Sequence, residues 1–218
     1  MYRPFEALPM DGKVISVIGS GGKTTLLRRL SERLPGTAIL TTSTHIYPFP
    51  GVPLVKDGGL DAIRAALARS RVICLGTPQP TGKLATPALP FEALASLADH
   101  VLIEADGAAG HPLKAHRPWE PVIPPCSDMT VCVIGASGIG RPASVACHCP
   151  ELFCALAGMT PGEPVTVEHI ARVVNREALA NCCLVNQIDA LSDVEEARRL
   201  CELIDVDACP CALALLER

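Results

Sequence analysis

The sequence has few aromatic residues and no excess of positive charge. Only 3% of its 218 residues are aromatic, and 19 Lys and Arg residues against 23 Asp and Glu residues give a formal net charge of −4. Nucleic-acid-binding surfaces gather cations on one face, and those that bind single strands add aromatic rings for base stacking. This composition indicates neither feature, so we expect no nucleic-acid partner.

Long hydrophobic runs are also missing. No apolar stretch approaches the roughly 20 residues that a membrane-spanning helix needs. The first ten residues, M-Y-R-P-F-E-A-L-P-M, lack the charged and then apolar layout of a secretory signal peptide. We therefore expect no membrane partner and a cytoplasmic location, while the oligomeric state stays open.

The eleven cysteines never occur at C-x-x-C spacing. An odd number cannot pair completely, and disulfides are rare in the cytoplasm, so a disulfide framework is not expected. Free Cys packs like a small hydrophobic residue, which is the interpretation that we favour for most of them. A soft-metal or selenium site is the alternative, and its candidates are the close pairs Cys147 and Cys149, Cys182 and Cys183, and Cys209 and Cys211.

Short apolar runs alternate with helical patterns along the chain. Uninterrupted apolar strands separated by helices are typical of a mostly parallel sheet covered on both faces. We predict a single α/β domain over residues 1–218, with a more helical segment at 136–180 as a possible subdomain. The breaker-rich stretch 76–90 is predicted to be a long surface loop. The expected strands are 14–18, 38–41, 72–75, 101–103, 131–134 and 184–185.

A glycine-rich turn joins the first of these strands to a helix, in the sequence S-V-I-G-S-G-G-K-T-T (16–25). Backbone N–H groups and the helix dipole can hold a phosphate at such a turn. The full eight-residue P-loop pattern would need Gly at position 17, where Val17 stands. A shorter pattern remains, and the alternative is a glycine turn with an exposed lysine. The predicted phosphate-binding residues are Gly19, Ser20, Gly21, Gly22, Lys23, Thr24 and Thr25.

Magnesium would need oxygen ligands near this turn. Thr24 can offer its hydroxyl, and the strand at 101–103 ends in Glu104, with Asp106 close behind. Thr44 and His45 follow the strand at 38–41 and could contact the metal or the γ-phosphate. The alternatives are an ordinary Asp-Gly turn and an ordinary Ser/Thr-rich turn.

Two further segments carry candidate residues. H-P-L-K-A-H-R-P-W-E-P-V-I-P-P (111–125) holds Lys114, which we expect near the γ-phosphate or an anionic substrate, or else in a solvated loop. C-L-V-N-Q-I-D-A-L (183–191) contains an N-Q-x-D sequence close to the guanine-reading N-K-x-D. Asn186 and Asp189 are therefore candidates for binding the base of GTP, although a loop capped by Asn and Asp is nearly as good an interpretation.

Taken together, these segments resemble the YqeC family. The resemblance spans nearly the whole chain, and its most distinctive block is E-A-D-G…P-L-K-A…E-P-V-I-P. The sequence C-H-C-P-E-L (147–152) resembles the family's H-R-P-E element, with Cys149 in the place of Arg. Family members are described as accessory proteins for selenium-dependent molybdenum hydroxylases, or as selenium cofactor biosynthesis proteins.

The resemblance implies a P-loop NTPase-like three-layer fold and a role in maturing a selenium-containing molybdenum cofactor or its hydroxylase. The first hypothesis is a slow Mg²⁺-dependent hydrolase of GTP or ATP with Lys23, Glu104, Asp106 and Lys114 as its catalytic residues. Similarity of the shortened loop to Mur-type ligases instead suggests a phosphoryl or nucleotidyl transferase or a ligase. The third hypothesis is a non-hydrolytic selenium or metal carrier that uses its cysteines.

Overall fold

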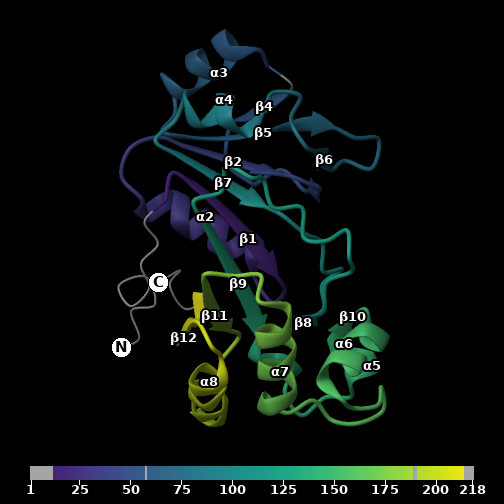
Figure 1. Cartoon of the computed structure of the whole chain (residues 1–218). Coiled ribbons are helices and arrows are strands. Elements are labelled where there is room, and N and C mark those ends of the chain that lie inside the picture. The colour runs from purple at the N-terminus through teal and green to yellow at the C-terminus, as the bar shows by residue number, and fades with distance from the viewer. Residues whose placement is uncertain (1–11, 57, 189–190, 214–218) are drawn as a thin grey trace.

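A mixed sheet runs through the molecule (Figure 1). The computed structural model describes residues 12–56, 58–188 and 191–213. Its ten strands are β1 (Val14–Gly19), β2 (Ala38–Thr42), β3 (His45–Ile46), β4 (Leu54–Lys56), β5 (Val72–Pro78), β6 (Leu84–Ala85), β7 (His100–Glu104), β9 (Met129–Gly135), β11 (Cys182–Asn186) and β12 (Asp207–Pro210).

Most of this sheet is parallel. The strand order is β12-β11-β9-β1-β7-β2-β5-β6-β3, with β4 also paired to β5. Within the described residues, the antiparallel pairings are those of β6 with β5 and of β6 with β3, at the far edge. The carboxyl ends of β1, β7, β2, β9 and β11 therefore lie along one edge, where open α/β sheets bind ligands.

Helices connect the strands and cover both faces of the sheet. In the described residues these are α2 (Lys23–Arg33), α3 (Leu60–Leu67), α4 (Phe91–Ala95), the 3₁₀ turn η1 (Ala136–Gly138), α5 (Ala143–Ala146), α6 (Pro150–Ala157), α7 (Val167–Glu177) and α8 (Leu191–Leu203). A small separate pair joins β8 (Leu113–Lys114) to β10 (Cys147–His148).

Apolar side chains alternate between the two faces of the sheet along each strand, which explains why helices cover both faces. In β1, Ile15 and Val17 pack with Leu26 and Leu30 of α2 on one face. The neighbouring residues point the opposite way, toward α3 and α4 in one region and toward α7 and α8 in another. Side chains that alternate between two apolar faces are the pattern of a sheet buried on both sides.

The main strand predictions are confirmed, and one loop prediction is wrong. All six expected runs lie within β1, β2, β5, β7, β9 or β11. Residues 76–90 are not a simple loop, because β5 continues to Pro78 and turns back into β6. Breaker residues mark the tight turn of a hairpin as readily as a loop, so composition alone misjudged this segment.

The segment 136–180 holds η1, α5, β10, α6 and most of α7, and lies at the lower right of Figure 1. Its apolar side chains share a cluster with sheet residues such as Ile18 and Ile134. Its status as a subdomain stays a prediction. None of the helices in the described part of the chain has the length and apolar character needed to cross a membrane.

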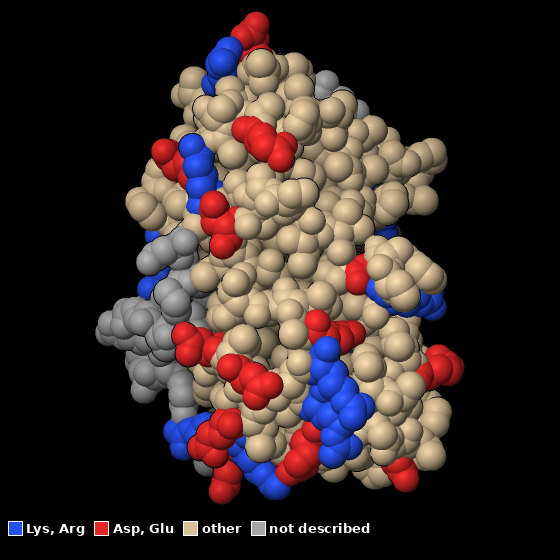
Figure 2. All heavy atoms as spheres, in the orientation of Figure 1, with Lys and Arg blue, Asp and Glu red and all other residues tan. Residues whose placement is uncertain are grey.

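Surface charge follows the acidic composition. On the face drawn in Figure 2, Lys and Arg side chains lie beside Asp and Glu side chains, and no continuous basic surface forms there. The surface charge on this face therefore does not mark a binding site.

Candidate functional site

The glycine turn folds tightly against the end of β9. Gly19, Gly21 and Gly22 all have positive φ angles, of 88°, 84° and 133°. A Cβ on Gly19 would lie 2.3 Å from the Val133 carbonyl oxygen, and a Cβ on Gly21 would lie 2.5 Å from the Gly135 Cα. Only glycine meets both demands, because it tolerates positive φ and allows close backbone approach. The turn leads directly into α2, whose N-terminus has no side-chain cap.

This uncapped helix end lines a cavity of about 620 Å³. Its volume falls within the roughly 300–1,000 Å³ typical of small-molecule sites. The glycine turn and the first residues of α2 form one wall, and residues 107–111 form another. The remaining lining residues are His45, Ile46, Tyr47, Lys83, Glu104 and Gln187.

Lys23 is buried in the wall of this cavity. Its Nζ donates a hydrogen bond to the Gly19 carbonyl oxygen at 2.7 Å and lies 3.0 Å from Asp106 Oδ1. The side chain is only 6% exposed, so the alternative of an exposed lysine does not describe this structure. The Lys23 ammonium group is therefore held against the glycine turn by Gly19 and Asp106.

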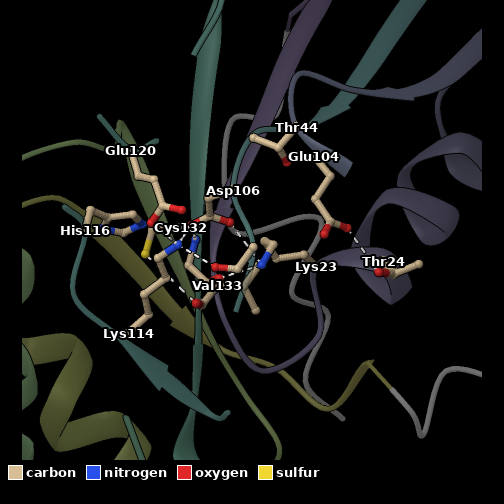
Figure 3. A network of polar contacts seen from close by, with 12 residues as sticks. Lys23, Thr24, Thr44, Glu104, Asp106, Lys114, His116, Glu120, Cys132 and Val133 are labelled. Atoms are coloured by element: carbon tan, nitrogen blue, oxygen red, sulfur yellow. Dashed lines mark hydrogen bonds and ion pairs between the residues drawn. The ribbon is translucent and has the colours of Figure 1, made fainter. Parts of the chain in front are cut away.

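Asp106 lies behind that wall and gathers several cations (Figure 3). Its Oδ2 accepts hydrogen bonds from the Gly19 N–H and from His116 Nε2, each at 2.8 Å, and lies 3.3 Å from Lys114 Nζ. Burial opposes ionisation, but the His116 hydrogen bond and the charges of Lys23 and Lys114 outweigh it and lower the pKa of Asp106 to about 2. Its catalytic role stays a prediction, and its observed contacts hold the glycine turn and Lys23.

His116 links Asp106 to α7. Its Nδ1 lies 2.8 Å from Glu177 Oε2, and its backbone N–H donates to Glu177 Oε1 at 2.6 Å. Burial lowers the pKa of His116, but the hydrogen bonds to Asp106 and Glu177 outweigh it and raise the pKa to about 9. The imidazole is therefore protonated at neutral pH and donates from both ring nitrogens. Sequence reasoning missed Glu177, because nothing in its helical surroundings marks it.

Lys114 of β8 is also behind the cavity wall. Its Nζ donates to the Gly107 carbonyl oxygen at 2.5 Å and lies 2.8 Å from Glu120 Oε2. The side chain is fully buried. In this arrangement Lys114 supports the 107–111 segment from behind, and its predicted contact with a γ-phosphate stays a prediction.

Glu104 faces the cavity at the end of β7. Thr24 Oγ1 donates to Glu104 Oε2 at 3.1 Å (Figure 3). Burial raises the pKa of Glu104, and attraction to Lys23 and the Thr24 hydrogen bond partly offset that effect. Thr44 lies nearby with its N–H bonded to Thr42 Oγ1 at 2.9 Å, but it does not line the cavity.

These oxygens suit magnesium. The Thr24 hydroxyl and the Glu104 carboxylate are hard donors on the cavity surface. Mg²⁺ commonly takes one or two protein oxygens and completes its shell with phosphate and water. Among the residues that the structure describes, no three His, Cys, Asp or Glu side chains are grouped to hold a metal. The site therefore suits a metal that arrives with a phosphate better than a metal held by protein alone.

Asn186 braces the glycine turn from β11. Its Nδ2 donates to the Gly21 carbonyl oxygen at 2.6 Å, and its Oδ1 accepts from the Leu213 N–H at 2.9 Å. Gln187 follows with a φ of 64° and lines the cavity. Asp189, the predicted base reader, lies outside the described residues.

The cysteines contribute nothing to the cavity. No disulfide joins any of the eleven, all of which are in the described residues. Cys147 and Cys209 belong to separate apolar clusters. Burial raises the pKa of the Cys147 and Cys211 thiols to about 12 and that of Cys209 to about 11. Such thiols are poor nucleophiles and poor metal ligands at neutral pH.

Comparison with known proteins agrees with the resemblance seen in the sequence. The family model described as YqeC protein matches residues 15–151. The chain belongs to the YqeC family. A curated YqeC relative, the "Uncharacterized protein YqeC" of Escherichia coli (strain K12), is 32% identical over 212 residues, which cover 88% of this chain and 81% of the relative. No solved structure matches the chain.

Proposed function

We propose that this YqeC-family protein is a P-loop NTPase-like protein that binds Mg²⁺ with GTP or ATP in the 620 Å³ cavity. One observation carries the proposal. Lys23, the uncapped start of α2 and the Thr24–Glu104 pair converge on one wall of that cavity. Helix N-termini with a fixed cation bind phosphate, and a hydroxyl beside a carboxylate suits its magnesium.

In this proposal the protein's groups are arranged before the ligand arrives. Gly19 and Asp106 hold the Lys23 ammonium at the cavity wall, where it would contact phosphate oxygens. Because Asp106 is already paired with three cations behind the wall, Glu104 is the carboxylate that faces the phosphate at the cavity surface, and magnesium would lie between the two. Bound magnesium would neutralise phosphate charge, and Thr24 and Glu104 would hold it.

The biological role that we propose is accessory to a selenium-containing molybdenum cofactor or its hydroxylase. The family resemblance supports this role, and a cytoplasmic location is part of the same proposal. A second candidate is a phosphoryl or nucleotidyl transferase or a ligase. The extent of the cavity favours it, because the lining continues past the glycine turn to His45, Tyr47 and Lys83.

The test is titration of the protein with GTP and with ATP, with and without Mg²⁺. Trp119 is the only tryptophan, and its side chain is 68% exposed beside the Lys114 segment, so its fluorescence can report binding while phosphate release is followed. We expect Mg²⁺-dependent binding that Lys23→Ala weakens by at least about 100-fold, since charge-assisted contacts to phosphate are lost.

Lys13→Ala is the matched control. Lys13 is exposed just before β1 and does not line the cavity, so its removal should leave nucleotide affinity unchanged. Circular dichroism of both variants checks that they fold. Calorimetry that detects no binding of either nucleotide to the wild-type protein would refute the proposed function.

A further inference from the structure

The cavity has a third wall that the proposed phosphate site does not use. The strand β3 contributes His45 and Ile46, Tyr47 follows it directly, and the turn of the β5–β6 hairpin contributes Lys83. Ile46 pairs antiparallel with Leu84, which brings Tyr47 and Lys83 to neighbouring positions across the two strands. Lys83 Nζ lies 5.2 Å from the centre of the Tyr47 ring. We call Lys83, Tyr47 and His45 the Lys83 wall.

Lys83 brings a positive charge to this wall. It forms no ion pair with any carboxylate in the residues that the structure describes. Burial raises the pKa of Glu104, and the charge of Lys83 is among those that oppose the rise. The positive charge of Lys83 therefore interacts with Glu104, a residue of the predicted metal site. A lysine that faces a cavity without its own anion is suited to a ligand's anionic group.

Tyr47 adds an exposed ring to the same wall. Its side chain is 61% exposed, and Ile46 beside it also lines the cavity. Aromatic rings in binding sites gain from stacking on planar ligands and from nearby cations. The wall thus combines a stacking surface with a positive charge.

The sheet order places this wall and Gln187 on opposite sides of the glycine turn. Gln187 follows β11, two strands from β1 on one side, whereas β2, β5, β6 and β3 lie on the other side. The glycine turn follows β1 between them. A nucleotide with its phosphates on the turn and its base toward Gln187 would leave the Lys83 wall open.

We infer that the Lys83 wall binds a second small ligand, a planar ring that carries a phosphate or carboxylate, beside the nucleotide. The inference rests on the proposed function, and it names the class of molecule on which a transferase or ligase at this site would act. Lys83 would pair with the anionic group, and Tyr47 would stack on the ring.

Flavin mononucleotide and riboflavin are suitable probes, because they share one ring and differ by one phosphate. Their binding would be followed by fluorescence polarisation with protein saturated by Mg²⁺ and a non-hydrolysable nucleotide. We expect flavin mononucleotide to bind about tenfold more tightly than riboflavin, which is the scale of one charge-assisted contact.

Variants separate the two parts of the wall. Lys83→Gln should weaken flavin mononucleotide binding about tenfold and bring it to the level of riboflavin. Tyr47→Leu should weaken both probes by a similar factor, because it removes stacking and not charge. Lys56→Gln is the control, since Lys56 is exposed on β4 away from the cavity, and it should change neither probe.

Two results would overturn the inference: no binding of flavin mononucleotide to the nucleotide complex, or unchanged binding in Lys83→Gln. Binding of the probe to nucleotide-free protein alone would mean that the nucleotide itself occupies this wall. Nucleotide affinity measured in the same samples separates this failure from failure of the proposed function. If nucleotide binds and the probe does not, only the inference falls.

Discussion

At the scale of single residues, the site depends on one buried carboxylate. Asp106 is fully buried and faces Lys23, Lys114 and His116 together with the Gly19 N–H. Each of these cations would be costly to bury alone, and Asp106 offsets that cost. The residue was foreseen from its place after the strand at 101–103, but as a candidate magnesium ligand and catalytic residue. In the structure, Asp106 instead pairs with the side chains of Lys23, Lys114 and His116.

Asp106→Asn should therefore destabilise the protein strongly. The substitution keeps the shape but leaves three buried cations without their shared anion, and we expect unfolding to become easier by about 3–5 kcal/mol. Urea denaturation would measure the change. Asp61→Asn is the control, because Asp61 is 99% exposed beside Arg64 and should give no measurable effect. A change for Asp106→Asn as small as that of the control would refute this account.

His116 predicts how stability depends on pH. The pKa of His116 is about 9 in the folded protein, against an ordinary 6.5. Its contribution to the free energy of unfolding is therefore complete below pH 6.5 and is lost as pH rises through about 9. The shift corresponds to about 3 kcal/mol. Asp106 acts oppositely, with a contribution that is lost as pH falls from about 4 toward 2.

Urea unfolding of wild-type protein between pH 6 and pH 8 should thus show falling stability, in a range below the pH at which thiols of the unfolded chain ionise. His116→Gln should be less stable at pH 6 and should lose most of this pH dependence. His45→Gln, at an exposed position, should keep the wild-type slope. Parallel pH profiles for wild type and His116→Gln would contradict the assignment of His116 as the titrating group.

At the scale of elements, the glycine turn joins β1, β9 and α2. The sequence predicted the turn because glycines, lysine and threonines stood between an apolar run and a helical pattern. It could not predict that Gly21 would lie against Gly135, because contact between two strand ends depends on strand order. For the same reason the Asn186 hydrogen bond to Gly21 appears only in the fold.

Gly21→Ala tests this close approach. Its Cβ would lie 2.5 Å from the Gly135 Cα at a φ of 84°, so we expect a loss of about 3 kcal/mol or more of stability and loss of nucleotide binding. Gly51→Ala shares a positive φ, of 77°, but its Cβ would meet nothing within 4 Å. It should cost only the backbone strain, about 1–2 kcal/mol. Equal losses in urea denaturation of the two variants would contradict the contact argument.

At the scale of the whole molecule, a chain of polar contacts crosses from the glycine turn to α7. Lys23 meets Asp106, Asp106 meets His116, and His116 meets Glu177 at the end of α7. The strand pattern predicted the sheet because apolar periodicity is local. Glu177 could not be predicted, since its partner lies 61 positions away and only tertiary packing brings the two together.

These linked polar contacts predict that a ligand that contacts Lys23 also stabilises α7. Hydrogen exchange with and without Mg²⁺-nucleotide should show added protection at the glycine turn, at the segment around His116 and at the C-terminal turn of α7. Glu177→Gln should keep the effect at the glycine turn but lose it at α7, because a neutral amide holds the imidazolium weakly. Glu168→Gln, on the same helix but paired with exposed Arg199, should behave as wild type. If α7 responds equally in both variants, packing rather than the His116–Glu177 pair connects it to the site.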